Sequence, residues 1–113
     1  MFAQLMGLKT ISPGALHQMM QEQQVTVIDV NSRQSWIKAQ VPGALNLDPT
    51  NYNASDLPPD KESSLVFYCS NPLCRKAPNE ARRAKKMGYR NVKVMSAGIS
   101  GWLASMLPTE GGE

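Results

Sequence analysis

Residues 65–75 read Leu65-Val66-Phe67-Tyr68-Cys69-Ser70-Asn71-Pro72-Leu73-Cys74-Arg75, a short apolar run that leads into a polar loop. Four continuous apolar residues are typical of a central parallel strand that is covered on both faces. A helical pattern follows from about Lys76 to Met87, in which alanines recur at helical spacing. The stretch therefore predicts a strand, a loop and a helix, with Cys69 at the carboxyl end of the strand.

Three further strands are predicted by β-branched or apolar runs at residues 25–30, 44–47 and 91–95. Helical segments alternate with them along the chain. Alternation of strands and helices predicts an α/β domain, a three-layer α/β/α arrangement with a parallel sheet between helices. Ligands in such sheets bind beyond the carboxyl ends of the strands, which is where the Cys69 loop falls.

Residues that favour helix N-termini mark two of the predicted helices. Ser12-Pro13 predicts a helix with serine as N-cap and proline at its first position, and Ser32 can cap a short helix containing Trp36. A final helix is predicted over residues 99–106. Residues 48–64 are rich in Asn, Asp, Ser and Pro, which predicts a long connection with one helical turn.

The length of 113 residues predicts a single domain over residues 1–113, with residues 1–8 and 108–113 as flexible ends. At 42% apolar residues the chain can bury one core. No apolar run approaches the roughly 20 residues needed to cross a bilayer, so no membrane association is expected. Residues 1–9 lack the basic start and apolar stretch of a secretory signal, and we expect a cytoplasmic protein.

The two cysteines, Cys69 and Cys74, are five positions apart with Pro72 between them. A bridge between neighbours closes too short a loop to staple a domain. Zinc is not expected either, because the one histidine, His17, is remote and neither thiol belongs to a C-x-x-C pair. The thiols are therefore reactive or incidental, and we expect neither a metal nor a cofactor.

The net charge of +3 is unevenly distributed, since eight of the twelve Lys and Arg residues lie between Arg75 and Lys93, with Glu80 as the only acid there. One interpretation is a solvated helix face. The other is a positive field that steers small anions toward residue 75. Nucleic acid is not expected as a partner, because the stretch has no interleaved aromatic residues.

A cysteine at a strand-to-helix junction has a distinctive environment. The loop N–H groups can point inward, and the following helix adds its positive end, so that a thiolate is stabilised there. Arg75 would close the ring with a planar guanidinium that suits an oxyanion. The Cys-x5-Arg spacing at this junction predicts that Cys69 is a nucleophile, and a buried inert cysteine is the alternative.

Several stretches of the chain form a recognisable series: Val27-Ile28-Asp29-Val30, Val41-Pro42-Gly43-Ala44-Leu45-Asn46-Leu47, Val66-Phe67-Tyr68-Cys69, Met87-Gly88-Tyr89, Val92-Lys93-Val94-Met95 and Gly98-Ile99-Ser100-Gly101-Trp102. Taken in order, these stretches resemble a single-domain rhodanese. The resemblance implies a five-stranded parallel sheet. It also implies that Cys69 is a catalytic cysteine of a sulfurtransferase, which accepts sulfane sulfur as a persulfide and passes it to a thiophilic acceptor.

That resemblance further implies the partners: a small anionic sulfur donor such as thiosulfate, and a thiol, cyanide-like or protein acceptor. The anion-binding loop would be the segment after Cys69, namely Ser70, Asn71, Pro72, Leu73, Cys74 and Arg75. Asp29, at a strand end, is expected to bond loop backbone or Arg33, or to act in a turn. Arg33 either helps to hold an anion or is a solvated surface residue.

The chain departs from the family at the loop, which has seven residues and is one longer than usual. That length matches related rhodanese-fold phosphatases and arsenate reductases, and it predicts a cradle wide enough for a tetrahedral oxyanion. Those relatives usually have His where this chain has Tyr68. Asn31 and Ala39-Gln40 replace the family's usual Arg and Gly-His.

Cys74 is a candidate resolving thiol, which would attack a persulfide or sulfenate on Cys69. The alternative is that it supports the loop or faces the core. Two other functions therefore remain beside sulfur transfer. One is a dithiol oxyanion reductase or phosphatase on the same scaffold, and the other is a non-catalytic rhodanese-like binding module.

Overall fold

The computed structural model describes residues 2–5 and 7–111. In chain order the elements are α1 (Phe2–Leu5), β1 (Lys9–Thr10), α2 (Pro13–Glu22), β2 (Thr26–Asp29), α3 (Arg33–Lys38), β3 (Leu45–Asn46), η1 (Ala54–Asp56), β4 (Ser64–Tyr68), α4 (Lys76–Lys86), β5 (Asn91–Val94) and α5 (Gly98–Ala104).

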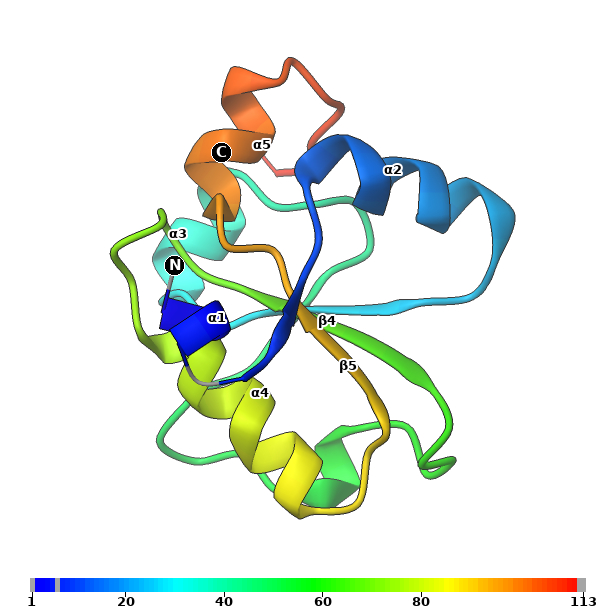
Figure 1. The fold of residues 1–113 in the computed structure, drawn as a ribbon. Helices are drawn as coiled ribbons and strands as arrows, with labels where there is room; N and C mark the ends of the chain where they lie inside the picture. Colours follow the sequence, from blue (N-terminus) through cyan, green and yellow to red (C-terminus); the bar gives the residue numbers. More distant parts are fainter. Residues whose placement is uncertain (1, 6, 112–113) are drawn as a thin grey trace.

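The five strands form one parallel sheet in the order β1-β5-β4-β2-β3. β4 lies at the centre, where Phe67 pairs with Ile28 of β2 on one side and Val94 of β5 on the other. Helix α4 covers one face of the sheet, and α2 and α5 lie together on the other (Figure 1). The predicted α/β fold with a five-stranded parallel sheet is confirmed.

The core has two parts because successive side chains of β4 point to opposite faces. Val66 and Tyr68 belong to the cluster under α2 and α5, which also contains the fully buried Trp102. Phe67 and Cys69 belong to the cluster under α4. Each large apolar side chain contributes roughly 1.5–3 kcal/mol on burial. The alternation also decides that the Cys69 side chain lies on the α4 side of the sheet.

The predicted helix caps are confirmed. The Ser12 hydroxyl accepts the Ala15 N–H at 3.1 Å, and the Ser32 hydroxyl accepts the Ser35 N–H at 3.2 Å. Helix α4 differs from α2 and α3, because Arg75 at its N-cap makes no side-chain capping bond. The last helix ends at Ala104, two residues earlier than predicted.

Strand β1 was not expected from the residue pattern, because it has two residues and both are exposed. At the chain ends, Leu8 is buried and Glu110 exchanges two backbone hydrogen bonds of 3.0 Å with Gln40. Residues 1, 6, 112 and 113 lie outside the described part, and flexible ends stay a prediction. Within the described residues, no helix is long and apolar enough to cross a membrane.

A buried carboxylate, Asp29, ends β2. It accepts the Asn31 N–H at 2.8 Å and the Tyr68 hydroxyl at 2.6 Å, and Tyr68 in turn accepts the Val41 N–H at 3.1 Å. Burial raises the pKa of the Asp29 carboxyl, and the bonds from Tyr68 and Asn31 offset part of the rise. Burial, together with the neighbouring Asp29, also raises the pKa of Tyr68.

The raised pKa of Asp29 predicts a stability that falls as pH rises. The folded state keeps the Asp29 proton to a higher pH than the unfolded chain, whose pKa is 3.8, so the folded state binds more protons in that window. This contribution is fully present below 3.8 and is lost as pH rises through the folded pKa. Asp29→Asn, which does not titrate, should remove this contribution to the pH dependence of the free energy of unfolding.

The measurement is the free energy of unfolding in urea at several pH values. The advantage of wild type over Asp29→Asn should be largest at acid pH and shrink toward neutral pH. Asp60→Asn, which removes an exposed carboxylate, is the control. A difference that is independent of pH would show that Asp29 has the same protonation equilibrium in both states.

Candidate active site

Cys69 follows β4 directly and lies at the carboxyl end of the central strand, as predicted. Its side chain is only 3% exposed and packs in the cluster under α4. Its carbonyl accepts the Ile99 N–H at 2.9 Å. The strand on one side and α5 on the other therefore fix this residue.

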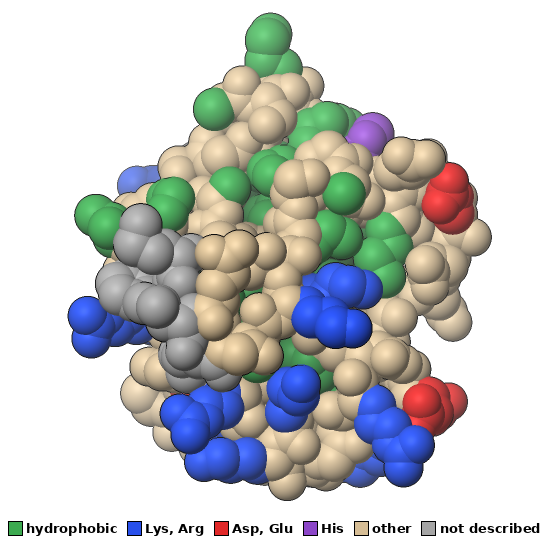
Figure 2. Space-filling view, in the orientation of Figure 1, with side chains coloured by type: hydrophobic (Ala, Val, Ile, Leu, Met, Phe, Trp, Pro, Cys, Tyr) green, Lys and Arg blue, Asp and Glu red, His purple; other side chains and the backbone are tan. Residues whose placement is uncertain are grey.

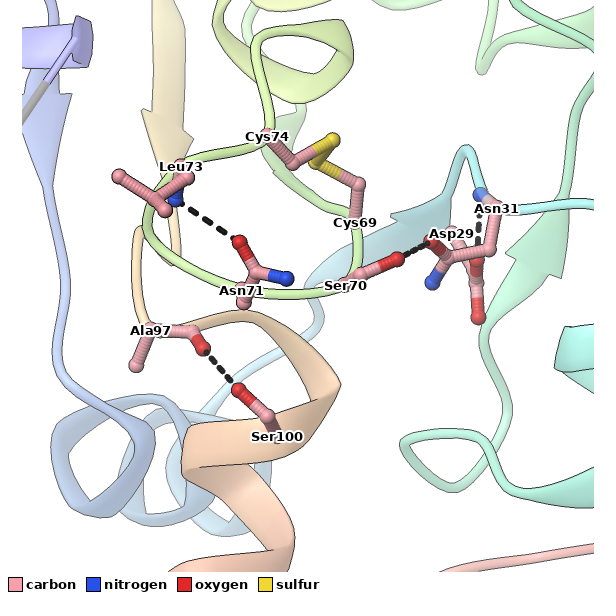
Figure 3. Close-up of a disulfide and its surroundings, with 9 residues drawn as sticks. All are labelled: Asp29, Asn31, Cys69, Ser70, Asn71, Leu73, Cys74, Ala97 and Ser100. Carbon is pink, nitrogen blue, oxygen red and sulfur yellow. Dashed lines mark hydrogen bonds between the residues drawn. A yellow bond between two sulfur atoms is a disulfide. The ribbon is translucent and has the colours of Figure 1, made fainter.

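A turn at Asn71-Pro72 reverses the loop. The Asn71 carbonyl accepts the Cys74 N–H at 3.1 Å, and the Asn71 side-chain oxygen accepts the Leu73 N–H at 2.9 Å. Asn at the first position of a turn and Pro at the second favour this conformation. The reversal carries Cys74 back toward Cys69 (Figure 3).

Cys69 and Cys74 are joined by a disulfide, with their Cα atoms 6.4 Å apart. That separation lies in the usual range for bridged cysteines. The turn therefore brings the two thiols within reaction distance without any movement of the strand. Contact between the two sulfur atoms supports a chemical partnership, and the resolving role of Cys74 remains a proposal.

The loop differs from the expected cradle in two respects. The N–H groups of Leu73 and Cys74 are bonded to Asn71 and do not point at Cys69. The hollow beside the disulfide measures about 10 Å³, which is room for about one water molecule. In this disulfide form the site is too small for the tetrahedral oxyanion expected from the loop length.

A polar chain holds the loop from the β2 side. The Ser70 hydroxyl donates to the side-chain oxygen of Asn31 at 2.7 Å, and the Asn46 amide donates to the Asn31 carbonyl at 2.9 Å (Figure 3 shows the first of these). No role at the site was predicted for either asparagine. Both lie at the carboxyl ends of neighbouring strands, a placement that could have identified them once the strand order was known.

Asp29 does not bond the Cys69 loop backbone or Arg33, which corrects two of the roles expected for it. Its side chain points to Tyr68 and the Asn31 N–H, so the expected turn role is the one observed. It reaches the loop indirectly, because the turn that it stabilises positions Asn31, which bonds Ser70.

Two arginines were expected near the site. Arg75 follows Cys74 directly, at the N-cap of α4, and is exposed. Arg33 is exposed, and its guanidinium carbon lies 5.8 Å from the ring centroid of Trp36. Arg33 and Lys76 line one hollow of about 490 Å³, together with Asn31 and Asp48. Asn31 connects this hollow to Ser70, so the two cations lie near the loop.

Most of the Lys and Arg side chains visible in Figure 2 lie over the lower half of the face, where Figure 1 places α4. Arg82 and Lys86 are six and ten positions beyond Lys76, which at 1.5 Å per residue is roughly 9–15 Å along the helix. That distance is close to or beyond the screening length of about 8 Å at physiological salt. A solvated face describes this part of the stretch better than steering does, and Arg75 and Lys76 remain at the site.

Helix α5 approaches the loop closely at Gly98, whose φ is +67°. Next to it, the Ser70 carbonyl accepts the Ser100 N–H at 3.0 Å. A Cβ at Gly98 would lie 2.5 Å from the Ser70 carbonyl carbon and 2.6 Å from the Asn71 nitrogen. Only glycine permits both this backbone conformation and this contact.

A family model described as "Rhodanese-like domain" matches residues 12–105. Among curated proteins, the chain is 25% identical over 100 residues to an uncharacterized protein, slr1261, of Synechocystis. The match covers 88% of this chain and 55% of that relative, so the chain spans about half the relative's length.

Among solved structures, BH2092 from Bacillus halodurans superposes with a TM-score of 0.81 at 21% identity, covering 91% of this chain and 77% of that one. A thiosulfate sulfurtransferase from Pseudomonas aeruginosa superposes with a TM-score of 0.80 at 25% identity. The second match covers 94% of this chain and 20% of the Pseudomonas protein.

Gly98→Ala should destabilise the protein by roughly 1–3 kcal/mol, because it adds a clash with Ser70 to a strained backbone. Gly14→Ala is the control, since its Cβ would meet nothing within 4 Å and its backbone is helical. Chemical denaturation of both variants measures the difference. Equal stabilities would show that the close contact between α5 and the loop relaxes at no cost.

Proposed function

The chain belongs to the rhodanese-like domain family, and we propose that it is a sulfurtransferase or sulfur carrier whose Cys69 holds sulfane sulfur as a persulfide. The observation that carries the proposal is the position of Cys69. It ends the central strand, its carbonyl is fixed by α5, and Arg75 and Lys76 follow within the next seven positions. Such a site offers a fixed thiolate with positive charge beside it.

With thiosulfate as donor, the Cys69 thiolate attacks the outer sulfur. The S–S bond of thiosulfate breaks, its electron pair leaves with sulfite, and a new S–S bond forms on Cys69. An acceptor such as cyanide or a thiolate then attacks the terminal sulfur and regenerates the Cys69 thiolate. The cations of Arg75, Lys76 and Arg33 favour both the anionic donor and the anionic leaving group.

A persulfide on Cys69 can also react with Cys74 instead of an external acceptor. The Cys74 thiolate attacks the Sγ atom of Cys69, hydrosulfide leaves, and the disulfide seen in the structure forms. Before another cycle, an external thiol must reduce that disulfide. A cytoplasmic location would supply such thiols, and disulfides there are usually catalytic or redox-sensing.

The bonded cysteine pair also favours a second candidate, a dithiol oxyanion reductase. In that reaction Cys69 attacks an oxidised oxyanion such as arsenate and displaces water. Cys74 then attacks Cys69, so that the pair is oxidised and the oxyanion is reduced by two electrons. Loss of activity in Cys74→Ser would favour this second candidate, because sulfur transfer by the first needs Cys69 alone.

Cys69→Ser should abolish persulfide formation, and Cys74→Ser should retain it. After reduction and exposure to thiosulfate, intact-mass spectrometry should show one added sulfur atom on Cys74→Ser. Reduced wild type should show the same adduct and then convert to the disulfide with release of hydrosulfide. An adduct on Cys69→Ser, or none on Cys74→Ser, would place the chemistry elsewhere.

Arg75→Ala should raise the KM for thiosulfate roughly ten- to hundredfold, the cost of a hydrogen bond to a charged group. Arg75→Lys should lose less, because it keeps the charge but not the planar fork. Arg82→Ala removes the same charge two turns along α4 and should change KM little. Equal effects of Arg75→Ala and Arg82→Ala would reduce the role of Arg75 to its long-range charge.

A further inference from the structure

Ser96 carries a buried hydroxyl that bonds to nothing within residues 2–5 and 7–111. It lies two residues beyond β5, at the same carboxyl edge of the sheet as Cys69. Buried side-chain hydroxyls almost always have a partner, and one without a partner is costly. This hydroxyl is therefore placed to bond something that the disulfide form of the protein does not offer.

The hollow of about 10 Å³ beside the disulfide shows where that partner would lie. Its lining includes Cys69, Cys74 and Ser96 together. Most of the remaining lining is apolar, contributed by Ala3, Pro72, Ala77, Pro78, Val94 and Met95. Asn71 also lines it, but its side-chain oxygen already accepts the Leu73 N–H. Of the described residues that line the hollow, Ser96 supplies the one hydroxyl.

We propose that the Ser96 hydroxyl donates a hydrogen bond to the sulfur anion at Cys69, and that the hollow seats this sulfur. The anion is the thiolate before transfer and the terminal sulfur of the persulfide after it. The persulfide part of this assignment rests on the proposed function. The hollow admits about one atom, so a sulfane sulfur fits there while the sulfite part of a donor remains outside.

In the disulfide form neither sulfur lies within hydrogen-bonding geometry of the Ser96 hydroxyl, and breaking the disulfide frees the Cys69 sulfur to turn into the hollow. A disulfide sulfur carries no charge and accepts hydrogen bonds weakly, whereas bonds to an ionised acceptor are much stronger. Once the bond is reduced and the thiol has lost its proton, the Cys69 thiolate is a negative charge in a mostly apolar hollow, where a single donor has a large effect. The hydroxyl thus favours the reduced, reactive state of Cys69 over the disulfide.

The first measurement needs no sulfur transfer. In the Cys74→Ser background, which cannot form the disulfide, the alkylation rate of Cys69 by iodoacetamide is followed against pH. Adding Ser96→Ala should move the midpoint of that profile up by about one pH unit, equivalent to about tenfold less thiolate at a fixed lower pH. Ser96→Thr keeps a hydroxyl and should restore most of the shift.

Ser100→Ala is the matched control. Its hydroxyl is also close to the loop, but it is exposed and donates to the Ala97 carbonyl at 3.2 Å. This variant should leave the alkylation midpoint unchanged. An unchanged midpoint in Ser96→Ala, or an equal shift in Ser100→Ala, would overturn the proposal, because the Ser96 hydroxyl would then not bond the sulfur.

The second measurement uses thiosulfate and intact mass. The persulfide on Cys69 should form more slowly in Ser96→Ala, by about the same factor as the loss of thiolate. If no persulfide forms even with Ser96 intact, the proposed function fails while the alkylation result still tests the hydrogen bond. If the persulfide forms equally fast with Ser96 intact and in Ser96→Ala, the Ser96 hydroxyl does not hold the terminal sulfur in the hollow. The sulfurtransferase proposal would still stand.

Discussion

The contact between the first turn of α5 and the Cys69 loop is the constraint on which the site depends. The N–H groups of Ile99 and Ser100 bond the carbonyls of Cys69 and Ser70, and Gly98 allows the two backbones to approach. These bonds fix the first two residues of the loop. From this fixed start, the turn at Asn71-Pro72 returns Cys74 to Cys69.

The sequence predicted the parts of the fold that have a local cause. β4 is a continuous apolar run, Ser12 and Ser32 are caps, and the Cys69 loop lies where a strand gives way to a helix. β1 has no such cause. Its two exposed residues form a strand only because β5 offers an edge, with Lys9 paired to Lys93, and a two-residue pattern carries no periodicity.

The candidate site could likewise be predicted from the sequence only where its residues are contiguous. Cys69 and the segment through Arg75 are contiguous, so spacing was enough to select them. Asn31 and Asn46 take part in hydrogen bonds with residues far away in the sequence, and Ser96 lines the same hollow as Cys69. No local pattern distinguishes these three residues from ordinary polar loop residues. The same reason explains why the roles expected for Asp29 were partly wrong, since its partner Tyr68 is 39 positions away.

Asp29 is unfavourable to bury, yet it helps to position a site that it does not contact. Burying a carboxyl group is unfavourable unless its hydrogen bonds are satisfied. Here the Tyr68 hydroxyl and the Asn31 N–H satisfy it, and the Val41 N–H completes the chain at Tyr68. An apolar residue at this position would leave the Asn31 N–H without its acceptor and free the turn after β2. Because Asn31 holds Ser70, the orientation of the loop that carries Cys69 depends on this buried carboxylate on the neighbouring strand.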